Sequence, residues 1–376
     1  MILGWNILIL FMKKTESINE LTVDQCFEVW KGKINTLIRE HPLQIISWEA
    51  TRRCNLKCLH CGSPAERVDL GNELSTKEVI GVFERIADSF DMSGFRHINV
   101  TGGEPFVRKD LLVILREISK YSFYRNIDIQ TNGLYIAENP EVLDELPRYG
   151  VTGIGVSIDG IGTYHDTFRN TKNGFEKAVM AARHAVRKGL VVTVSVVIHA
   201  KNIDTLDLIY TYIEQNVQPR VLRFMFIDPI GRTTVDSGFL LSNDQKRRVI
   251  DFLRVKYELA CDRYADKNTM MVELGCGGWF GKELEGTFRP FIFHCIAGIN
   301  NLGILYDGKI ASCSNISREF IEGDIRLDDI RDVWENRFLR YRDRSWKRIG
   351  KCKDCKDWDF CHGGPMHLSN NYKCMI

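Results

Sequence analysis

The sequence lacks any large excess of charge of one sign. Its 376 residues carry 51 Lys and Arg against 49 Asp and Glu, which leaves a formal net charge of +2. Because neither sign dominates a long stretch, the basic surface typical of nucleic-acid-binding proteins is missing. We therefore expect no nucleic acid among its partners.

Long apolar runs are missing as well. Residues 1–10 are apolar, but they reach only about half of the roughly 20 residues that cross a bilayer. A secretory signal carries its positive charges before the apolar run, whereas Lys13 and Lys14 follow it here. The sequence predicts neither a membrane span nor export. Because Met12 opens a polar segment, it is open whether residues 1–11 are translated.

Cysteine, in contrast, is abundant and clustered. Of twelve cysteines, three lie within residues 54–61 and seven within residues 276–376, and only Cys26 and Cys261 stand apart. Disulfide frameworks belong to small secreted domains, which this chain does not resemble. Two cysteine-based metal or redox sites are therefore favoured. Cys26 and Cys261 are interpreted as ordinary buried cysteines.

Strand-like and helical patterns alternate through the first two thirds of the chain. The strand-like runs are 44–50, 97–101, 127–131, 153–158, 191–198 and 221–227. The helical patterns are 15–41, 75–90, 109–122, 138–148, 173–188, 204–215 and 243–265. Strands joined by single helices pair in parallel through right-handed crossovers. The order predicts an α/β fold, either an open doubly wound sheet or an incomplete barrel, and periodicity alone does not choose between them.

The first cysteine motif comes directly after the first predicted strand. The chain reads Cys54-Asn-Leu-Lys-Cys58-Leu-His-Cys61. Three thiolates at this spacing can wrap one face of a compact metal cluster, and they are one ligand short of closing a tetrahedral zinc or a four-iron site. A metal with one open position is typical of catalysis. Taken alone, the motif is equally compatible with buried thiols or with part of a zinc site.

Further motifs follow the next three strands in order. They are Gly102-Gly103-Glu104-Pro105, Gln130-Thr131-Asn132-Gly133, and Ser157-Ile158-Asp159-Gly160 with His165, Asp166 and Arg169 beyond it. With the cysteines, this series resembles the radical SAM superfamily. The resemblance implies a partial (β/α)6 TIM-type barrel and a 4Fe-4S cluster on Cys54, Cys58 and Cys61 whose open iron binds S-adenosylmethionine (SAM). The sequence departs from the family at His60, where an aromatic residue is usual.

The resemblance also assigns contacts to SAM. The matching residues are Gly102, Gly103, Glu104, Asn132, Ser157 and Arg169. Glu104 would pair with the methionyl ammonium, and two glycines would let the ligand approach the backbone closely. Gln130 and Asp159 are interpreted as residues that shape loops. Reductive cleavage of SAM would give a 5'-deoxyadenosyl radical that abstracts hydrogen from a substrate.

The second cysteine region resembles the SPASM extension of radical SAM enzymes, which binds auxiliary iron-sulfur clusters. Cys352, Cys355, Cys361 and Cys374 match the ligands of one cluster. For the other, the residues that match or could substitute are Cys295 and Cys313, Cys276 as a third ligand, and His294, His362 or His367 as a fourth. The family's remaining cysteine falls on Pro365, so this cluster either has an open or non-cysteine position or is absent.

Two features of this region have simpler interpretations. A zinc ribbon also satisfies four cysteines at such spacing, and would make the chain a non-catalytic docking protein. Basic residues crowd the cysteines and could offset the charge of a cluster, namely Lys347, Arg348, Lys351, Lys353 and Lys356. Because Asp354, Asp357 and Asp359 interleave with them, a solvated surface is the more ordinary interpretation.

The resemblance implies an enzyme that modifies a peptide or protein in the cytoplasm of an anaerobe. A radical enzyme acting on a small molecule in cofactor biosynthesis is the alternative. Ser314 stands where sulfatase-maturing enzymes carry an aspartate, which disfavours formylglycine formation. Arg52 and Arg53 could attract a low-potential electron donor of the flavodoxin or ferredoxin type.

We also expect four units along the chain. They are an N-terminal helical segment (1–42), a radical SAM core (43–235), a connecting helix (236–275) and a small cysteine-rich α+β domain (276–376).

Overall fold

The fold was obtained as a computed structural model that describes residues 22–63, 65, 71–263, 269–368 and 374. The question of where translation starts, and the first part of the predicted helical segment at 15–41, lie outside the described residues. Among the described residues, no helix combines the length and the apolar character that crossing a membrane requires.

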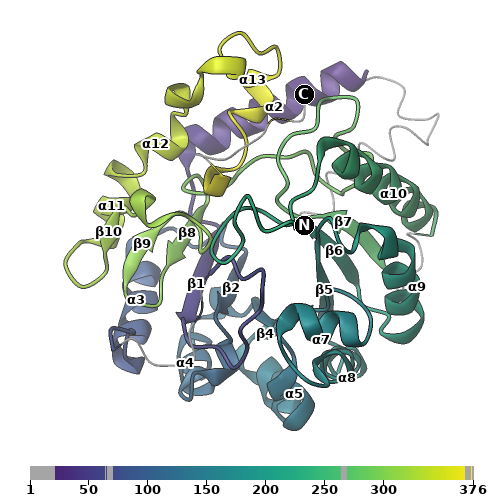
Figure 1. Ribbon diagram of the computed structural model, residues 1–376. Coiled ribbons are helices and arrows are strands. Elements are labelled where there is room, and N and C mark those ends of the chain that lie inside the picture. The colour runs from purple at the N-terminus through teal and green to yellow at the C-terminus, as the bar shows by residue number, and fades with distance from the viewer. Residues whose placement is uncertain (1–21, 64, 66–70, 264–268, 369–373, 375–376) are drawn as a thin grey trace.

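Parallel strands form the centre of the molecule (Figure 1). The six that were expected are β1 (Ile45–Thr51), β2 (His97–Gly102), β3 (Ile127–Thr131), β4 (Val151–Ser157), β5 (Val191–Ile198) and β6 (Val221–Phe226). Each pairs in parallel with the next in chain order. All residues of β1 are buried, as in a parallel sheet covered on both sides. The arrangement agrees with a partial TIM-type barrel.

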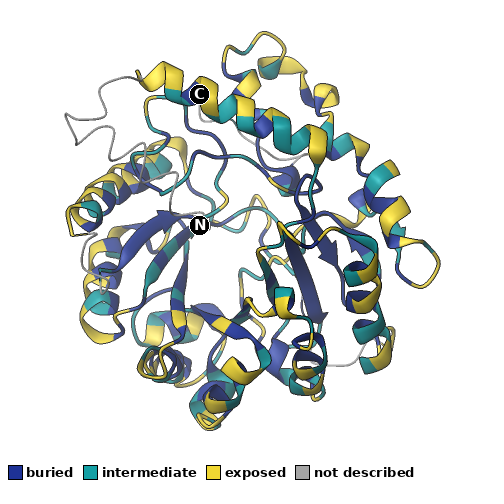
Figure 2. Ribbon diagram, turned by 180° about the vertical axis from the view of Figure 1, so that it is seen from behind, coloured by how far each residue is buried: buried dark blue, intermediate teal, exposed yellow. Residues whose placement is uncertain are grey.

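Helices surround the strands, and their exposed residues face away from the sheet (Figure 2). In the first two thirds of the chain they are α2 (Val23–Glu40), α3 (Thr76–Ser89), α4 (Leu111–Ile118), α5 (Leu134–Glu138), α6 (Val142–Glu145), α7 (Thr163–Arg169), α8 (Gly174–Arg187), α9 (Leu206–Asn216) and α10 (Asn243–Asp262). A capping box formed by Ser75 and Glu78 opens α3.

Two helical predictions need correction. The segment 138–148, predicted as a single helix, contains the last residue of α5, the whole of α6 and most of a 3-10 turn at Leu146–Tyr149, because Pro140 cannot continue α5. The sequence patterns also missed α7, which carries His165, Asp166 and Arg169.

The sheet is larger than the six predicted strands. Its other members are β7 (Met271–Leu274), β8 (Asn301–Ile304), β9 (Lys309–Ala311) and β10 (Gly323–Asp324). The strand order is β10-β9-β8-β1-β2-β3-β4-β5-β6-β7, with β8 parallel to β1 and β9 antiparallel to β8. The segment 236–275, predicted as a connecting helix, therefore holds both α10 and a strand. The same sheet continues from β7 to β8, across the predicted boundary at residue 275. The division of the chain into four units stays a prediction.

The cysteine-rich C-terminal region (residues 276–376) lies against the N-terminal helix (Figure 1). Its helices are α11 (Ile330–Asn336), α12 (Leu339–Arg342) and α13 (Trp358–Cys361). Phe27 of α2 packs edge-on against Trp279 and Phe360, with ring centroids 5.9 and 5.8 Å away. The helix predicted as a separate N-terminal segment thus helps to hold the C-terminal region in place.

Candidate active site

The loop with Cys54, Cys58 and Cys61 begins where β1 ends, at the carboxyl edge of the sheet, where α/β folds place their chemistry. Burial, together with smaller contributions from Glu104 and the other two thiols, raises the pKa of the Cys54 thiol to about 12. Such a loop favours neutral thiols until a cation arrives, and metal binding reverses that preference. Among the described residues, no three Cys, His, Asp or Glu side chains converge on one point that could hold a single metal ion.

Two glycines bring the next loop against the strand that leads into Cys54. A Cβ atom on Gly102 would lie 2.3 Å from the Thr51 carbonyl oxygen, and one on Gly103 would lie 2.2 Å from that of Arg53. Gly103 and Glu104 donate their N–H groups to the same two carbonyls, at 2.8 and 2.9 Å. In this structure the glycines allow two protein segments to touch, a role that the sequence prediction of ligand approach did not include.

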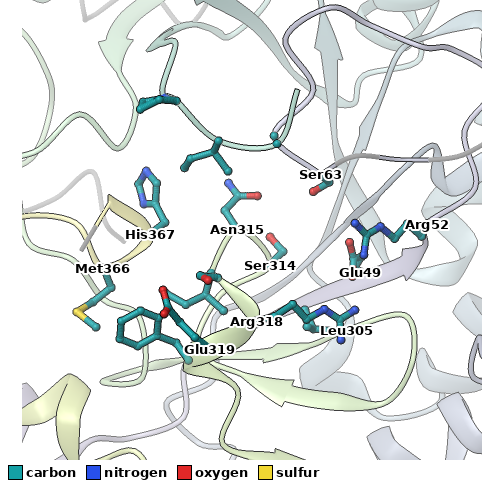
Figure 3. Close-up of a pocket in the computed structure, with 17 residues that line it drawn as sticks. Glu49, Arg52, Ser63, Leu305, Ser314, Asn315, Arg318, Glu319, Met366 and His367 are labelled. Carbon is teal, nitrogen blue, oxygen red and sulfur yellow. The ribbon is translucent and has the colours of Figure 1, made fainter. Parts of the chain in front are cut away.

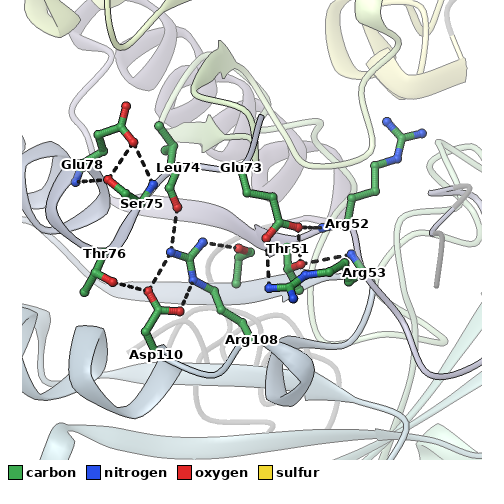
Figure 4. A network of polar contacts seen from close by, with 11 residues as sticks. Thr51, Arg52, Arg53, Glu73, Leu74, Ser75, Thr76, Glu78, Arg108 and Asp110 are labelled. Carbon is green, nitrogen blue, oxygen red and sulfur yellow. Dashed lines mark hydrogen bonds and ion pairs between the residues drawn. The ribbon is translucent and has the colours of Figure 1, made fainter. Parts of the chain in front are cut away.

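A polar network braces the same strand end (Figure 4). The Arg108 guanidinium donates to the carbonyls of Ala50 and Leu74, both at 2.8 Å, and bonds Asp110 through two nitrogens. Arg108 therefore ties the end of β1 to the end of the loop that holds the cysteines. Since this arginine lies four residues after Glu104, the loop after β2 supports the cysteine loop at two points.

Arg52 and Arg53 are part of the site and do not form an exposed docking patch. Arg53 bonds Glu73 at 3.3 Å, and the Arg52 guanidinium lies 5.6 Å from the centre of the Tyr306 ring. Neither residue is exposed. The predicted attraction of an electron donor by these two arginines therefore has no support in the structure.

Glu104 is 1% exposed and accepts three hydrogen bonds. Their donors are the Thr131 hydroxyl at 2.8 Å and the backbone N–H groups of Asn132 at 2.8 Å and Phe106 at 3.3 Å. Burial outweighs these bonds and raises the pKa of Glu104 to about 7. A cation beside this carboxylate would be strongly favoured, as the predicted pairing with an ammonium requires.

The other predicted SAM contacts come from neighbouring strand ends. Asn132 donates its amide to Asn55 Oδ1 at 2.7 Å, so it reaches the cysteine loop directly. Ser157 ends β4 and is half-buried. Arg169 is buried on α7 and acts electrostatically on the Cys54 and Cys58 thiols. The structure brings Asn132 and Arg169 to the cysteine loop, and the contacts of all three residues with SAM stay predictions.

Asp159 has a larger part than the loop-shaping role predicted for it. It bonds Arg169 Nε at 2.7 Å and accepts the Val197 N–H at 2.9 Å, and His60 Nε2 lies 3.6 Å away. Burial alone would raise its pKa, but Arg169, the neighbouring histidines His60 and His165 and the Val197 N–H together lower it to about 2. Sequence reasoning missed this anchor, because only the fold brings Asp159 and His60 together.

His60 takes the place of an aromatic ring. It stacks on Phe168 at a centroid distance of 4.2 Å with the planes 2° apart, and Phe168 stacks in turn on His199 at 4.3 Å. Burial lowers the pKa of His60 to about 4, so the ring is neutral near pH 7. The departure from the family pattern thus preserves a flat, uncharged ring beside Cys61.

A loop after β6, which the sequence did not single out, clasps the cysteine loop from the opposite side. Arg232 donates its N–H to the Cys61 carbonyl at 3.0 Å and its side chain to the Cys58 carbonyl at 3.2 Å. Gly231 has φ +65°, and a Cβ there would lie 2.3 Å from the Cys61 carbonyl oxygen. No pattern in the sequence marks Gly231 and Arg232 for this role.

The C-terminal cysteines form two groups. In the first, Cys295 is buried, Cys313 is half-buried and Cys276 is exposed. Cys295 and Cys313 are electrostatic neighbours of Cys276 and raise the pKa of its thiol. The buried Arg289 supports the loop of Cys276 by donating to the Gly278 carbonyl at 2.8 Å. These three cysteines are the ones that the sequence assigned to one auxiliary cluster.

Three histidines were candidates for the missing ligand of this group. His294 has two buried ring nitrogens without a hydrogen-bond partner among the described residues, and its ring centroid is 5.8 Å from that of His362. His367 Nε2 instead lies 3.5 Å from the Asp228 carboxylate. Met366, directly after Pro365, donates its N–H to Cys295 Sγ at 3.4 Å. Of the three histidines, His294 is therefore the best candidate for the missing metal ligand, because both of its ring nitrogens lack a hydrogen-bond partner among the described residues.

The second group consists of Cys352, Cys355, Cys361 and Cys374. Burial raises the pKa of Cys361 to about 12, and Cys374 and Cys352 add to the shift. Burial, Cys374 and Cys355 likewise raise the pKa of Cys352. All four predicted ligands are therefore electrostatic neighbours, although Cys374 stands between residues that the structure does not describe.

A cavity of about 390 Å³ lies between the first cysteine loop and the C-terminal region (Figure 3). Gly62 and Ser63, directly after Cys61, line it from one side, and Ser314 to Phe320, directly after Cys313, line it from the other. Glu49 of β1 lies in its wall, accepts the Tyr306 N–H at 3.3 Å, and has a pKa raised by burial to about 7. Glu49 was not predicted as a site residue, because no pattern in the sequence marks a strand position as part of a cavity.

The fold and these residues are typical of one class of protein. Its members have a partial barrel, a loop after the first strand whose three cysteines can bind a metal cluster, and a second cysteine-rich region on the other side of a cavity. A family model described as the radical SAM superfamily matches residues 48–213, and the SPASM iron-sulfur cluster-binding domain matches residues 295–356. The mycofactocin maturase MftC of Mycobacterium tuberculosis is 30% identical over 328 residues, covering 85% of this chain and 78% of that protein. The chain belongs to the radical SAM superfamily and carries a SPASM domain.

Other relatives differ in the chemistry that their names describe. An Fe-coproporphyrin III synthase of Methanosarcina barkeri is 27% identical over 369 residues, which cover 91% of this chain and 90% of that protein. A solved structure of anSMEcpe with bound AdoMet and a Cp18Cys peptide has a TM-score of 0.64 at 19% identity and covers 88% of this chain and 92% of that one. At this identity the second likeness shows the fold alone.

Membership of the family establishes the kinds of cofactor: a SAM-binding 4Fe-4S cluster, auxiliary iron-sulfur clusters and SAM. The donor sets described above fit them. Thiols with raised pKa values, a buried carboxylate that a cation would stabilise, and two separate cysteine groups in the C-terminal region are the features that these cofactors need.

Proposed function

We propose that this protein is a radical SAM enzyme that modifies a peptide or protein. Cys54, Cys58 and Cys61 would hold the SAM-binding cluster, and Glu104 would pair with the methionyl ammonium. When bound, SAM supplies a 5'-deoxyadenosyl radical for hydrogen abstraction. The chain's own residues bind and orient the reactants and exclude water from them.

One observation carries the proposal: the cavity lies between the two kinds of cysteine site. A substrate held between Ser63 and Asn315 would have the SAM-binding loop on one side and the first C-terminal cysteine group on the other. Ser63, Ser314, Asn315 and Ser317 contribute hydrogen-bonding groups to the lining, as recognition of a peptide backbone requires. The likeness to a protein named as a maturase agrees with this reading.

A second candidate is a small-molecule substrate, as the name of the Fe-coproporphyrin III synthase suggests. The cavity is near the lower end of the roughly 300–1,000 Å³ typical of sites that enclose a drug-sized ligand. A tetrapyrrole with its side chains is larger than this cavity, so the cavity would have to widen to bind it. For this reason we favour the peptide.

The experiment uses anaerobically reconstituted full-length enzyme, SAM and dithionite, with a soluble extract of the host lacking the gene as the substrate source. Formation of 5'-deoxyadenosine above the rate without extract reports a substrate. If the substrate is a peptide or protein, protease treatment of the extract removes this stimulation. Stimulation that survives protease, or that iron coproporphyrin alone reproduces, would contradict the proposal and support the small molecule.

We further propose that the enzyme works in the cytoplasm and takes electrons from a low-potential flavodoxin or ferredoxin. The oxygen sensitivity of the clusters supports this location.

A further inference from the structure

Lys347 is a buried cation within the cysteine-rich C-terminal region. It is 8% exposed, and its Nζ atom is buried without a hydrogen-bond partner among the described residues. Its aliphatic chain packs on the backbone of Gly363, where an added Cβ would lie 3.0 Å from both Lys347 Cβ and Cε. Burying an ammonium without a compensating anion is costly. A negatively charged group close to Nζ would therefore stabilise this lysine in its charged form.

The groups beside Lys347 that would become anionic on binding a metal cluster are thiols of both C-terminal cysteine groups. Burial and Arg344 lower the pKa of Lys347 to about 8, whereas Cys295, Cys361 and Cys352 oppose this shift. Cys295 belongs to the first group, and the other two belong to the second. Lys347 is thus electrostatically coupled to both.

Neighbouring cations do not share this position. Arg348, Lys351, Lys353 and Lys356 are all exposed, as expected for a solvated surface. Arg344 is buried, but it bonds backbone carbonyls, including that of Cys295 at 2.8 Å. Of the five basic residues that could offset cluster charge, the structure selects Lys347.

We propose that Lys347 is the internal counter-charge of the auxiliary iron-sulfur clusters and raises their reduction potential. Reduction adds one electron, and so one negative charge, to a thiolate-ligated cluster, while the ammonium keeps its proton. A buried positive charge nearby stabilises the reduced form more than the oxidised form, and net charge is one of the factors that set cluster potentials. The inference needs the auxiliary clusters but does not depend on the substrate.

The test is a redox titration of full-length protein with dithionite, followed by electron paramagnetic resonance. Replacing Cys54, Cys58 and Cys61 by alanine in every sample removes the signal of the SAM-binding cluster. In this background we compare Lys347→Met, which keeps the length of the side chain, with Lys347→Arg, which keeps the charge. Lys351→Met is the control for an exposed cation of the same segment.

We expect Lys347→Met to reduce the ratio of reduced to oxidised auxiliary cluster about tenfold at a fixed potential, equivalent to about 59 mV for one electron. Lys347→Arg and Lys351→Met should titrate like the parent. A Lys347→Met protein with full iron content and an unchanged titration overturns the proposal.

If Lys347→Met fails to assemble clusters, iron loading becomes the readout. Loading restored by Lys347→Arg but not by Lys347→Gln supports a role for the charge. Loading lost equally in the Arg variant shows that the residue serves packing alone, and also overturns the proposal.

Discussion

Glu104 shows how burial prepares a side chain for a charged ligand. Its carboxylate is surrounded by hydrogen-bond donors, yet burial raises its pKa to about 7, so a substantial share of the unliganded protein carries it protonated near neutrality. A methionyl ammonium can pair only with the ionised form. The affinity for SAM should therefore depend on pH.

We expect SAM to bind more tightly as the pH rises from 6 to about 7, with up to about a tenfold gain per pH unit, and to level off above that value. Isothermal titration of the anaerobically reconstituted protein measures this. Glu104→Gln should bind weakly at every pH and lose the step. An affinity of the parent protein that stays constant between pH 6 and 8 would show that Glu104 is not the ammonium partner.

Glu49 allows a matching prediction about stability. Its pKa is raised from 4.5 to about 7 in the folded protein, so folding favours the protonated form. The resulting stabilisation is complete below about pH 4.5 and is lost as the pH rises through 7. Glu49→Gln, which keeps an acceptor for the Tyr306 N–H, removes this dependence.

The free energy of unfolding of Glu49→Gln should therefore exceed that of the parent by up to about 3 kcal/mol at pH 8, and the gain should shrink toward pH 5. Urea unfolding of both proteins across this range tests the expectation. An equal difference at both ends of the range would contradict the assigned pKa.

At the scale of the elements, the strands of the core were predictable because each is short, apolar or β-branched, and bounded by turns. The match of the runs at 127–131 and 191–198 to β3 and β5 is complete. The clasp by Gly231 and Arg232 was not predictable, because glycine and arginine in a loop carry no signal of what they touch. Nor was β8, whose partner Ile45 is far from Asn301 in the chain and whose pairing has no local pattern.

The close contact between the end of β1 and the loop after β2 leads to a further prediction. Gly103→Ala would place a Cβ 2.2 Å from a backbone oxygen that cannot move without moving the segment leading to Cys54. We expect a loss of about 1–3 kcal/mol, typical of overpacking, together with less iron per chain after reconstitution. Thermal unfolding and iron analysis measure the two effects.

Gly81→Ala is the matched control. Gly81 lies inside α3, and a Cβ there meets nothing within 4 Å, so the change should be neutral or slightly stabilising with full iron content. If Gly103→Ala keeps its stability and iron content as Gly81→Ala does, the cysteine loop does not depend on its close contact with the loop after β2.

At the scale of the whole molecule, barrel and cysteine-rich region behave as parts of one structure. The sheet continues from β1 into β8, and α2 packs onto the C-terminal region through Phe27. This continuity keeps both walls of the cavity in a fixed relation. The sequence predicted the barrel and the cysteine-rich region as separate domains. Their attachment to each other was not predictable, because it depends on contacts between residues distant in the chain.

Phe27→Ala should therefore weaken the attachment of the C-terminal region. Truncating this buried ring, which is 3% exposed, should cost about 3–5 kcal/mol and make proteolysis of the region faster. Val29→Ala on the same helix, at a side chain 47% exposed, should change little. Limited proteolysis followed by mass spectrometry compares the two, and equal cleavage rates would contradict the role of Phe27.

The central claim is that ten cysteines form three iron-sulfur sites. Iron, acid-labile sulfide and zinc per chain, measured after anaerobic reconstitution, test it most directly. The account predicts about 12 iron with matching sulfide and negligible zinc, including a cluster at Cys276, Cys295 and Cys313. About 8 iron would remove that third site, and zinc without sulfide would contradict the claim as a whole.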